Sequence, residues 1–145
     1  MTALGSDHAG YEMKLKLIRY FQDNGIKFYD FGCYTPEAAD YPIYARQVCE
    51  AVESGRYVNG ILLCGTGVGM SIAANRCGGI RAALCRDAHA AAMTREHNDA
   101  NVLVLGARVT EYAQIIEITT AFFNTPFSNE ERHVRRLSML NTHLT

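Results

Sequence analysis

Short apolar runs alternate with segments of helical periodicity along the whole chain, and this alternation most limits the folds open to it. Such an order is typical of parallel strands joined by crossover helices. We expect five strands, which the apolar runs place at 1–4, 26–31, 60–64, 80–85 and 101–105. The sequence therefore predicts a doubly wound, three-layer α/β/α domain of the Rossmann-like type with a five-stranded parallel sheet.

The segments between the apolar runs carry the helical signals. We expect helices over about 11–21, 41–52, 71–77, 87–97, 110–123 and 129–141. Thr110 is suited to cap the fifth of them. An apolar stripe on the last helix is expected to face the core, and it consists of Val134, Leu137 and Leu140.

Composition limits the partners and the compartment. The chain has 145 residues, enough for one domain over 1–145 that buries a core without disulfides or metal. Its 14 basic and 15 acidic side chains give a net charge of -1, which provides no electrostatic footprint for nucleic acid. The five cysteines include no CxxC pair and are expected to be reduced thiols in a cytoplasmic protein. Glycines interrupt the longest uncharged segment, 57–75, so no membrane partner is expected.

The segment Cys64-Gly-Thr-Gly-Val-Gly69 follows a wholly apolar run and precedes a helix. Alternating glycines at such a point let backbone N–H groups approach an anion or oxyanion and point at it. The spacing differs from the dinucleotide-binding fingerprint, and no Gly-Lys-Ser/Thr follows as in a Walker loop. Met70 and Ser71 stand where a cysteine phosphatase would need an arginine. The alternative is a tight strand-to-helix turn without a ligand, and the glycines alone do not distinguish the two.

Ligands of doubly wound sheets lie beyond the carboxyl ends of the strands. We therefore expect segments 5–8, 64–69 and 106–108, together with Asp87, to gather at one edge. Cys64 is then a candidate base or nucleophile, because adjacent N–H groups and a helix N-terminus can stabilise its thiolate. The alternative role, a small buried hydrophobe, better fits the cysteines inside helix or strand patterns, which are Cys49, Cys77 and Cys85.

Two polar pairs are candidates for proton transfer. Asp7-His8 follows the first strand and His97-Asn98 follows a helix, so we expect both pairs to project into one cleft. The other histidines are expected to be structural or at the surface, and they are His89, His133 and His143. No metal site is predicted from Asp7, His8, Cys64 and His97, because no histidines four residues apart and no cysteine knuckle support one.

Arg132 and Arg136 lie four residues apart, on one face of the last helix. Guanidinium groups at this spacing can clamp a phosphate. Taken alone, a solvated basic face is the simpler interpretation. Arg108 after the fifth strand and the glycine loop add weight to the clamp, and together they indicate a small anionic substrate.

The candidate residues fall in longer motifs, which are Gly5-Ser-Asp-His-Ala-Gly10, Asp40-Tyr-Pro42, Cys64-Gly-Thr-Gly-Val-Gly-Met-Ser-Ile-Ala-Ala-Asn75, Gly79-Ile-Arg-Ala82, Arg95-Glu-His-Asn-Asp-Ala-Asn101 and Gly106-Ala-Arg-Val109. With these motifs the chain resembles type B ribose-5-phosphate isomerase and the related galactose- and allose-6-phosphate isomerases. The resemblance extends over essentially the whole sequence, and it rests most on the cysteine–glycine loop combined with the His-Asn-Asp segment.

The resemblance implies a cytoplasmic aldose–ketose isomerase that needs no metal and no organic cofactor. It implies Cys64 as the base that moves a proton between C1 and C2 of the open-chain sugar through a cis-enediolate. Thr66 would assist proton transfer between the two oxygens, and His97 would be the ring-opening acid and base. Some family members carry a glutamate a few residues later and lack the cysteine, whereas Met70 and Ser71 occupy that part of this loop.

The resemblance also implies how the substrate is held. The backbone of the loop would bind the enediolate oxygens at Gly65, Gly67 and Gly69. Contacts to sugar hydroxyls would come from Asp7, Tyr41 and Asn98. The phosphate would be bound by His8, Arg108, Arg132 and Arg136. The family further implies a homodimer or homotetramer with sites shared between subunits, in which the helix at about 129–141 packs on the partner.

Two other functions remain open from the sequence. One is an isomerase of a six-carbon sugar phosphate, and the other is a non-catalytic sensor that kept the sugar-phosphate pocket. The presence of Cys64, Thr66 and His97 argues against the sensor, because binding alone needs none of them. The depth of the cleft decides between five- and six-carbon sugars.

Overall fold

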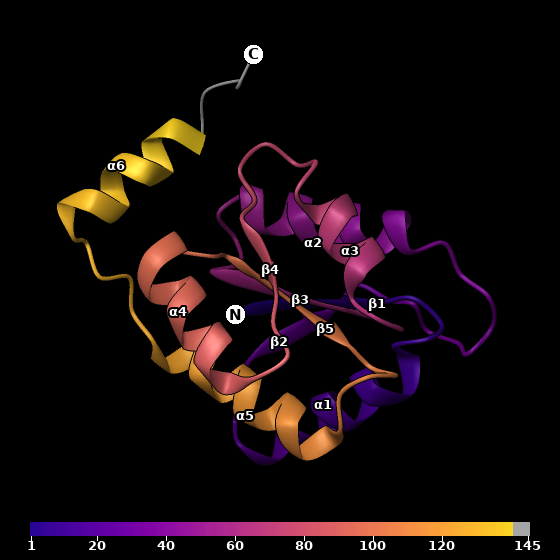
Figure 1. The fold of residues 1–145 in the computed structure, drawn as a ribbon. Coiled ribbons are helices and arrows are strands. Elements are labelled where there is room, and N and C mark those ends of the chain that lie inside the picture. Colours follow the sequence, from indigo (N-terminus) through magenta and orange to yellow (C-terminus); the bar gives the residue numbers. More distant parts are fainter. Residues whose placement is uncertain (141–145) are drawn as a thin grey trace.

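A computed structural model describes residues 1–140 of the chain (Figure 1). Five parallel strands form one sheet in the order β2-β1-β3-β5-β4. The strands are β1 (Thr2–Ser6), β2 (Phe28–Asp30), β3 (Asn59–Cys64), β4 (Ala82–Leu84) and β5 (Val102–Gly106). The predicted α/β class and five-stranded parallel sheet are confirmed.

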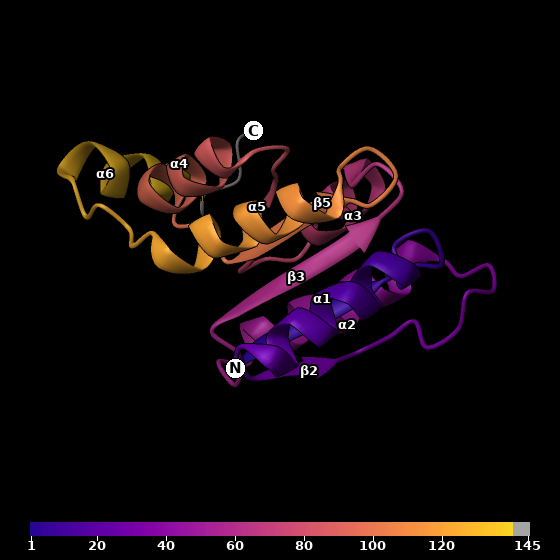
Figure 2. The same cartoon turned by 90° about the horizontal axis from the view of Figure 1, so that it is seen from below.

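Helices cover both faces of the sheet (Figures 1 and 2). One face is covered by α2 (Tyr41–Glu53) and α3 (Val68–Ala74), and the other by α1 (Tyr11–Asp23), α4 (Ala88–Asn98) and α5 (Tyr112–Asn124). Leu62 of β3 lies in the first core, and its neighbours Ile61 and Leu63 lie in the second. Burial on both faces explains why the central strands β3 and β5 appear in the sequence as unbroken apolar runs. None of the helices within residues 1–140 is long and apolar enough to span a bilayer.

Val48 of α2 lies over two glycines of adjacent strands. A Cβ atom at Gly60 would stand 2.7 Å from Val48 Cγ1, and one at Gly5 would stand 2.9 Å from Val48 Cγ2. The missing side chains let α2 approach β1 and β3 closely. This contact sets how closely α2 packs on the sheet.

An ion pair of a buried lysine ties α1 to the end of β2 and to the chain that follows it. Lys14 is fully buried, and its Nζ donates to the Asp30 carboxylate at 2.6 and 2.8 Å and to the Cys33 carbonyl at 2.5 Å. Fixing Cys33 also holds the start of the long loop 31–40, whose other end contacts His8 through Ala39. The pair therefore anchors a segment that reaches the candidate site.

Two helix starts differ from the expectation. Gly67 has a φ of +82° and occupies the N-cap position, so α3 begins at Val68, directly after the loop, and not at 71. Thr110 does not cap α5. It lies buried in the turn after β5, and Glu111 takes the N-cap position without a side-chain hydrogen bond.

The last helix, α6 (Glu131–Leu140), packs against α4 and projects beyond the sheet (Figure 1). The expected core-facing stripe is wrong, since Val134 is 48% exposed, Leu140 is 59% exposed and Leu137 is only partly covered. The buried residue of α6 is His133. The reason is that α6 packs against the end of α4 and not against the sheet, so only a narrow face of α6 is covered. His143 and residue 141, the expected end of this helix, lie outside the described residues.

Candidate active site

The loops after β1, β3 and β5 meet at the carboxyl ends of the parallel strands, as predicted. β3 ends at Cys64, and the N–H of Arg108, after β5, donates to the Gly65 carbonyl at 2.9 Å. On the other side of β3, the N–H of Asp7 donates to the Leu63 carbonyl at 3.2 Å. Main-chain hydrogen bonds thus hold three candidate segments around the carboxyl end of the central strand.

Packing already requires two glycines of the loop. Gly67 is in the left-handed region, and a Cβ there would collide with Leu84. A Cβ at Gly69 would stand 2.9 Å from the ring of Tyr41. The tight-turn interpretation therefore accounts for both glycines without a ligand. A role in binding must rest on the polar groups around the loop.

Cys64 is 5% exposed at the head of this loop, and its Sγ accepts the N–H of Gly67 at 3.2 Å. A donor directed at the sulfur favours negative charge on it. Two other cysteines lie in different surroundings: burial, and then Asp87, raise the pKa of Cys85 to about 11, and burial with the nearby Cys77 raises the pKa of Cys49 well above its usual value. The surroundings of these two thiols thus differ from those of Cys64, whose role stays a prediction.

Asp7 and His8 are both held by backbone groups. The buried Asp7 carboxylate accepts the N–H of Gly10 at 3.1 Å. Nδ1 of His8 lies 3.1 Å from the N–H nitrogen of Ala39 and 3.3 Å from its carbonyl oxygen. The shorter contact favours an imidazole that accepts at Nδ1 and carries its proton on Nε2. That Nε2–H is a donor for a ligand at this edge.

Arg108 supplies positive charge beside the loop. A Cβ at Gly65 would stand 3.4 Å from Arg108 Cδ and 3.5 Å from one of its terminal nitrogens. Arg108 is exposed, and it makes no ion pair with any side chain of residues 1–140. Thr66 is also exposed, and its hydroxyl accepts the N–H of Val68 at 3.3 Å. A guanidinium without an ion pair, beside a loop that carries a thiol and a hydroxyl, suits a small phosphorylated molecule.

The structure divides the predicted site residues between the two ends of the sheet. α4 begins at the carboxyl edge, where the Asp87 side chain caps it, and runs back to end at His97 and Asn98. The Asn98 carbonyl accepts the Nε–H of Arg81, which directly precedes β4. Within one chain the two pairs therefore do not share a cleft, and their common cleft stays a prediction. The reason is that a crossover helix runs antiparallel to the strand before it, so its end lies far from Cys64.

The two arginines of α6 lie near the end of α4, with His97 and Asn98, and not near Cys64. Figure 2 shows α6 and the end of α4 at one end of the molecule, and the loops after β3 and β5 at the other. Arg132 and Arg136 are exposed, and Arg132 Nε lies 3.0 Å from a carboxylate oxygen of Glu130. Within one chain they do not approach Arg108. The predicted site residues thus form two separate groups in one chain, here called half-sites, one with the thiol and one with His97 and the α6 arginines.

Sequence reasoning missed the partners of His97. The ring of His133 lies 4.5 Å from the His97 ring, centroid to centroid, and its Nδ1 lies 2.6 Å from the hydroxyl oxygen of Ser128. Burial, His97 and the arginines lower the pKa of His133, against the opposite effect of Glu130. A single histidine in a basic helix gives no periodic signal, so its burial against α4 was not predictable from the pattern.

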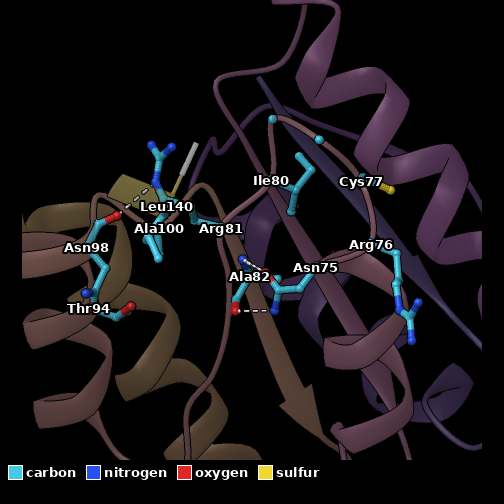
Figure 3. A pocket seen from close by; sticks show the side chains of 12 residues that line it. Asn75, Arg76, Cys77, Ile80, Arg81, Ala82, Thr94, Asn98, Ala100 and Leu140 are labelled. Atoms are coloured by element: carbon cyan, nitrogen blue, oxygen red, sulfur yellow. Dashed lines mark hydrogen bonds between the residues drawn. The ribbon is translucent and has the colours of Figure 1, made fainter. Parts of the chain in front are cut away.

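A cavity of about 740 Å³ opens beside Asn98, between the end of α4 and the segment after α3 (Figure 3). Two of its polar side chains support the main chain around it. The Asn75 amide bonds the N–H and carbonyl of Ala82 at 2.9 Å each, and the Arg81 guanidinium bonds the carbonyls of Asn98 and Asp99. Arg81 was not predicted as a site residue, although the Gly79–Ala82 motif contains it. Among the described residues, no group of three or more potential metal ligands occurs.

The family model described as Ribose/Galactose Isomerase matches residues 2–140. The chain belongs to this family. Ribose-5-phosphate isomerase B of Escherichia coli K12 is 40% identical over 138 residues, covering 95% of this chain and 92% of that protein. A Rickettsia conorii protein, named only provisionally as a sugar phosphate isomerase, is 42% identical over 94% of both chains.

A solved structure extends the likeness from sequence to fold. The ribose 5-phosphate isomerase B structure from Thermotoga maritima aligns with a TM-score of 0.94 and 46% identity, over 97% of this chain and 96% of that one. The family member described here is thus a sugar phosphate isomerase similar to ribose-5-phosphate isomerase B.

Proposed function

We propose that the chain interconverts ribose 5-phosphate and ribulose 5-phosphate. The observation that carries the proposal is the setting of Cys64, a nearly buried thiol at the end of the central strand with the Gly67 N–H directed at its sulfur. A thiolate there can take a proton from carbon, and nearby N–H groups can bind the oxygen that becomes negative. The names of the Escherichia coli and Thermotoga maritima relatives support the five-carbon sugar.

The proposed reaction balances without an oxidant. His97 opens the sugar ring by transferring a proton between the hydroxyl and the ring oxygen. The Cys64 thiolate then takes the C2 proton, and the C–H electron pair forms the C1–C2 double bond of a cis-enediolate while the C1 carbonyl π pair moves onto O1. The Thr66 hydroxyl assists proton transfer from O2 to O1, and the Cys64 thiol returns its proton to C1. The oxidation of C2 thus equals the reduction of C1.

Binding is proposed to use both half-sites. The backbone at Gly65, Gly67 and Gly69 would hold the enediolate oxygens, with hydroxyl contacts from Asp7, Tyr41 and Asn98. The phosphate would be bound by His8, Arg108, Arg132 and Arg136. Because His97 and the α6 arginines lie at the far end of the same sheet, they would serve the thiol of a second copy of the chain.

The site is therefore proposed to be complete only in a homodimer, or in a homotetramer built from such dimers. Exposed apolar side chains occur on both half-sites, with Val134 and Leu140 on α6 and Val68 and Val109 at the carboxyl edge. Covering such side chains favours association. The projecting α6 would then pack on the partner subunit while the rest of 1–145 forms one domain.

Isomerisation of a six-carbon sugar phosphate is the second candidate. The family description includes galactose, and the name of the Rickettsia conorii relative states no sugar. A sensor that binds without catalysis is the weaker alternative, because a thiol with a directed N–H has no use in binding alone.

Kinetics on a panel of aldose phosphates, in the presence of EDTA, test the proposal. We expect conversion of ribose 5-phosphate to ribulose 5-phosphate, with higher kcat/KM than for allose or galactose 6-phosphate. A higher value for a hexose phosphate would support the second candidate, and binding without turnover would support the sensor. Activity lost with EDTA and restored by a divalent ion would contradict the metal-free mechanism.

A further inference from the structure

His133 is the buried side chain of α6 and is 3% exposed. Its ring meets the His97 ring at a centroid distance of 4.5 Å and an interplanar angle of 40°. His97 is the proposed ring-opening group, yet it lies in the last turn of α4, where helix ends are mobile. The contact therefore joins the end of one helix to a side chain on another.

Ser128 fixes the other side of the His133 ring. The Ser128 N–H donates to the Glu96 carbonyl of α4 at 3.1 Å, which attaches this segment beside His97. Its hydroxyl oxygen accepts the N–H of Glu130 at 3.2 Å and lies 2.6 Å from His133 Nδ1. With the oxygen engaged as an acceptor, the hydroxyl proton is free to be donated to Nδ1.

The charges around His133 favour a neutral ring. Arg132 and Arg136 on its own helix and His97 on α4 oppose a positive charge there, and Glu130 favours one. Burial acts in the same direction as the arginines, and the pKa of His133 is lowered. A neutral ring that accepts at Nδ1 can lie against His97 without charge repulsion when His97 is protonated.

We propose that Ser128 and His133 form a positioning pair that holds the His97 imidazole for ring opening. The inference rests on the proposed function, since it assigns a role to neighbours of the ring-opening group. Neither residue touches the reacting carbons. The pair acts through His97, and the same burial of His133 sets the rotation of α6 and so the directions of its arginines.

Replacement of the Ser128 hydroxyl tests the pair. Ribose 5-phosphate is largely a ring that must open, whereas ribulose 5-phosphate has its C5 oxygen phosphorylated and stays open-chain. For Ser128→Ala we expect kcat/KM for ribose 5-phosphate to fall about three- to tenfold, the effect of one lost hydrogen bond. Exchange of the C1 hydrogen of ribulose 5-phosphate with deuterium from solvent, which needs Cys64 but no ring opening, should stay within about twofold of the parent.

Three variants complete the design. Ser128→Thr keeps a hydroxyl and should restore the parent rates. His133→Phe keeps a buried ring without Nδ1. Like Ser128→Ala, it should slow the isomerisation of ribose 5-phosphate and leave the hydrogen exchange of ribulose 5-phosphate nearly unchanged. Ser138→Ala is the matched control, because within residues 1–140 the Ser138 hydroxyl bonds only the Arg135 carbonyl of α6. Equal losses in isomerisation and exchange, or no loss in either variant of the pair, would overturn the proposal.

Histidine side-chain NMR provides a readout that does not depend on turnover. In the parent we expect His133 to be neutral near pH 7 with its proton on Nε2, and the His97 ring signals to shift in Ser128→Ala but not in Ser138→Ala. A proton on Nδ1 of His133, or unchanged His97 signals, would refute the pair. If the parent neither isomerises nor exchanges, the proposed function fails, and these spectra still decide whether the pair exists.

Discussion

Cys64 is the residue on which the proposed chemistry depends, and substitution by serine separates chemistry from packing. Serine differs little in volume, so a packing role predicts a nearly normal enzyme. A serine hydroxyl is not ionised at neutral pH without a partner base, so a base role predicts a large loss of activity. For Cys64→Ser we expect kcat with ribose 5-phosphate to fall about 10²–10⁴-fold, the usual contribution of general base catalysis.

The matched control for this substitution is Cys77→Ser. Cys77 is partly exposed after α3 and away from the glycine loop, and its replacement should leave kcat within about twofold of the parent. If Cys64→Ser keeps a tenth or more of kcat with His97 intact, the base is another group. The buried carboxylate of Asp7, on the neighbouring strand end, is then the next candidate.

At the scale of the element, α6 carries the proposed phosphate clamp. Arg132 and Arg136 are exposed, so alanine at either position should leave the circular dichroism spectrum unchanged. Each substitution should lower kcat/KM by a factor that corresponds to a loss of about 1.5–3 kcal/mol in transition-state stabilisation, the range for a hydrogen bond to a charged group. Arg135→Ala removes another exposed cation of the same helix and is the control. Inhibition by inorganic phosphate that is as strong for Arg132→Ala as for the parent would contradict the clamp.

A second prediction at this scale concerns the tie between α1 and the chain after β2. In Lys14→Met the Asp30 carboxylate loses its partner, and removal of one member of a buried pair costs about 3–5 kcal/mol. Asp30 is partly exposed, and water can reach it, so we expect the lower end, about 3 kcal/mol, in the free energy of unfolding. Urea denaturation at fixed protein concentration measures this, with exposed Lys16→Met as the control. A difference below about 1 kcal/mol between the two variants would show that the pair is not a major tie.

At the scale of the whole molecule, two half-sites at opposite ends of one sheet predict complementation between inactive variants. When Cys64→Ser and His97→Asn chains are unfolded and refolded together, half of the dimers should be mixed. In each mixed dimer, one site combines the intact Cys64 of one chain with the intact His97 of the other. We therefore expect about one quarter of the parent activity from symmetric pairing.

Each variant refolded alone is the control and should stay inactive. Analytical ultracentrifugation of the parent should show a dimer or larger species at the assay concentration. An active monomer, or a mixture no more active than its separate components, would show that the site is not shared.

The sequence by itself determined the succession of strands and helices along the chain, because buried central strands need apolar runs and crossover helices need one apolar face. It also identified the Cys64 loop, whose neighbours in the sequence are its neighbours in space. It did not determine the helix ends: Gly67 fixes the start of α3 by a left-handed backbone, which the apolar pattern does not reveal.

Only the tertiary structure decided which candidates lie together. In the sequence, Asp7-His8 and His97-Asn98 are equally good candidates. In the fold, Asp7-His8 follow the carboxyl end of a strand, whereas His97-Asn98 end a crossover helix that has run back toward the amino ends of the strands. Likewise, the periodicity of α6 predicted a buried apolar stripe, whereas contact with the end of α4 buries His133 and leaves Val134 and Leu140 exposed. Apolar periodicity reports that a face is covered, but what covers it depends on distant parts of the chain or on a second copy.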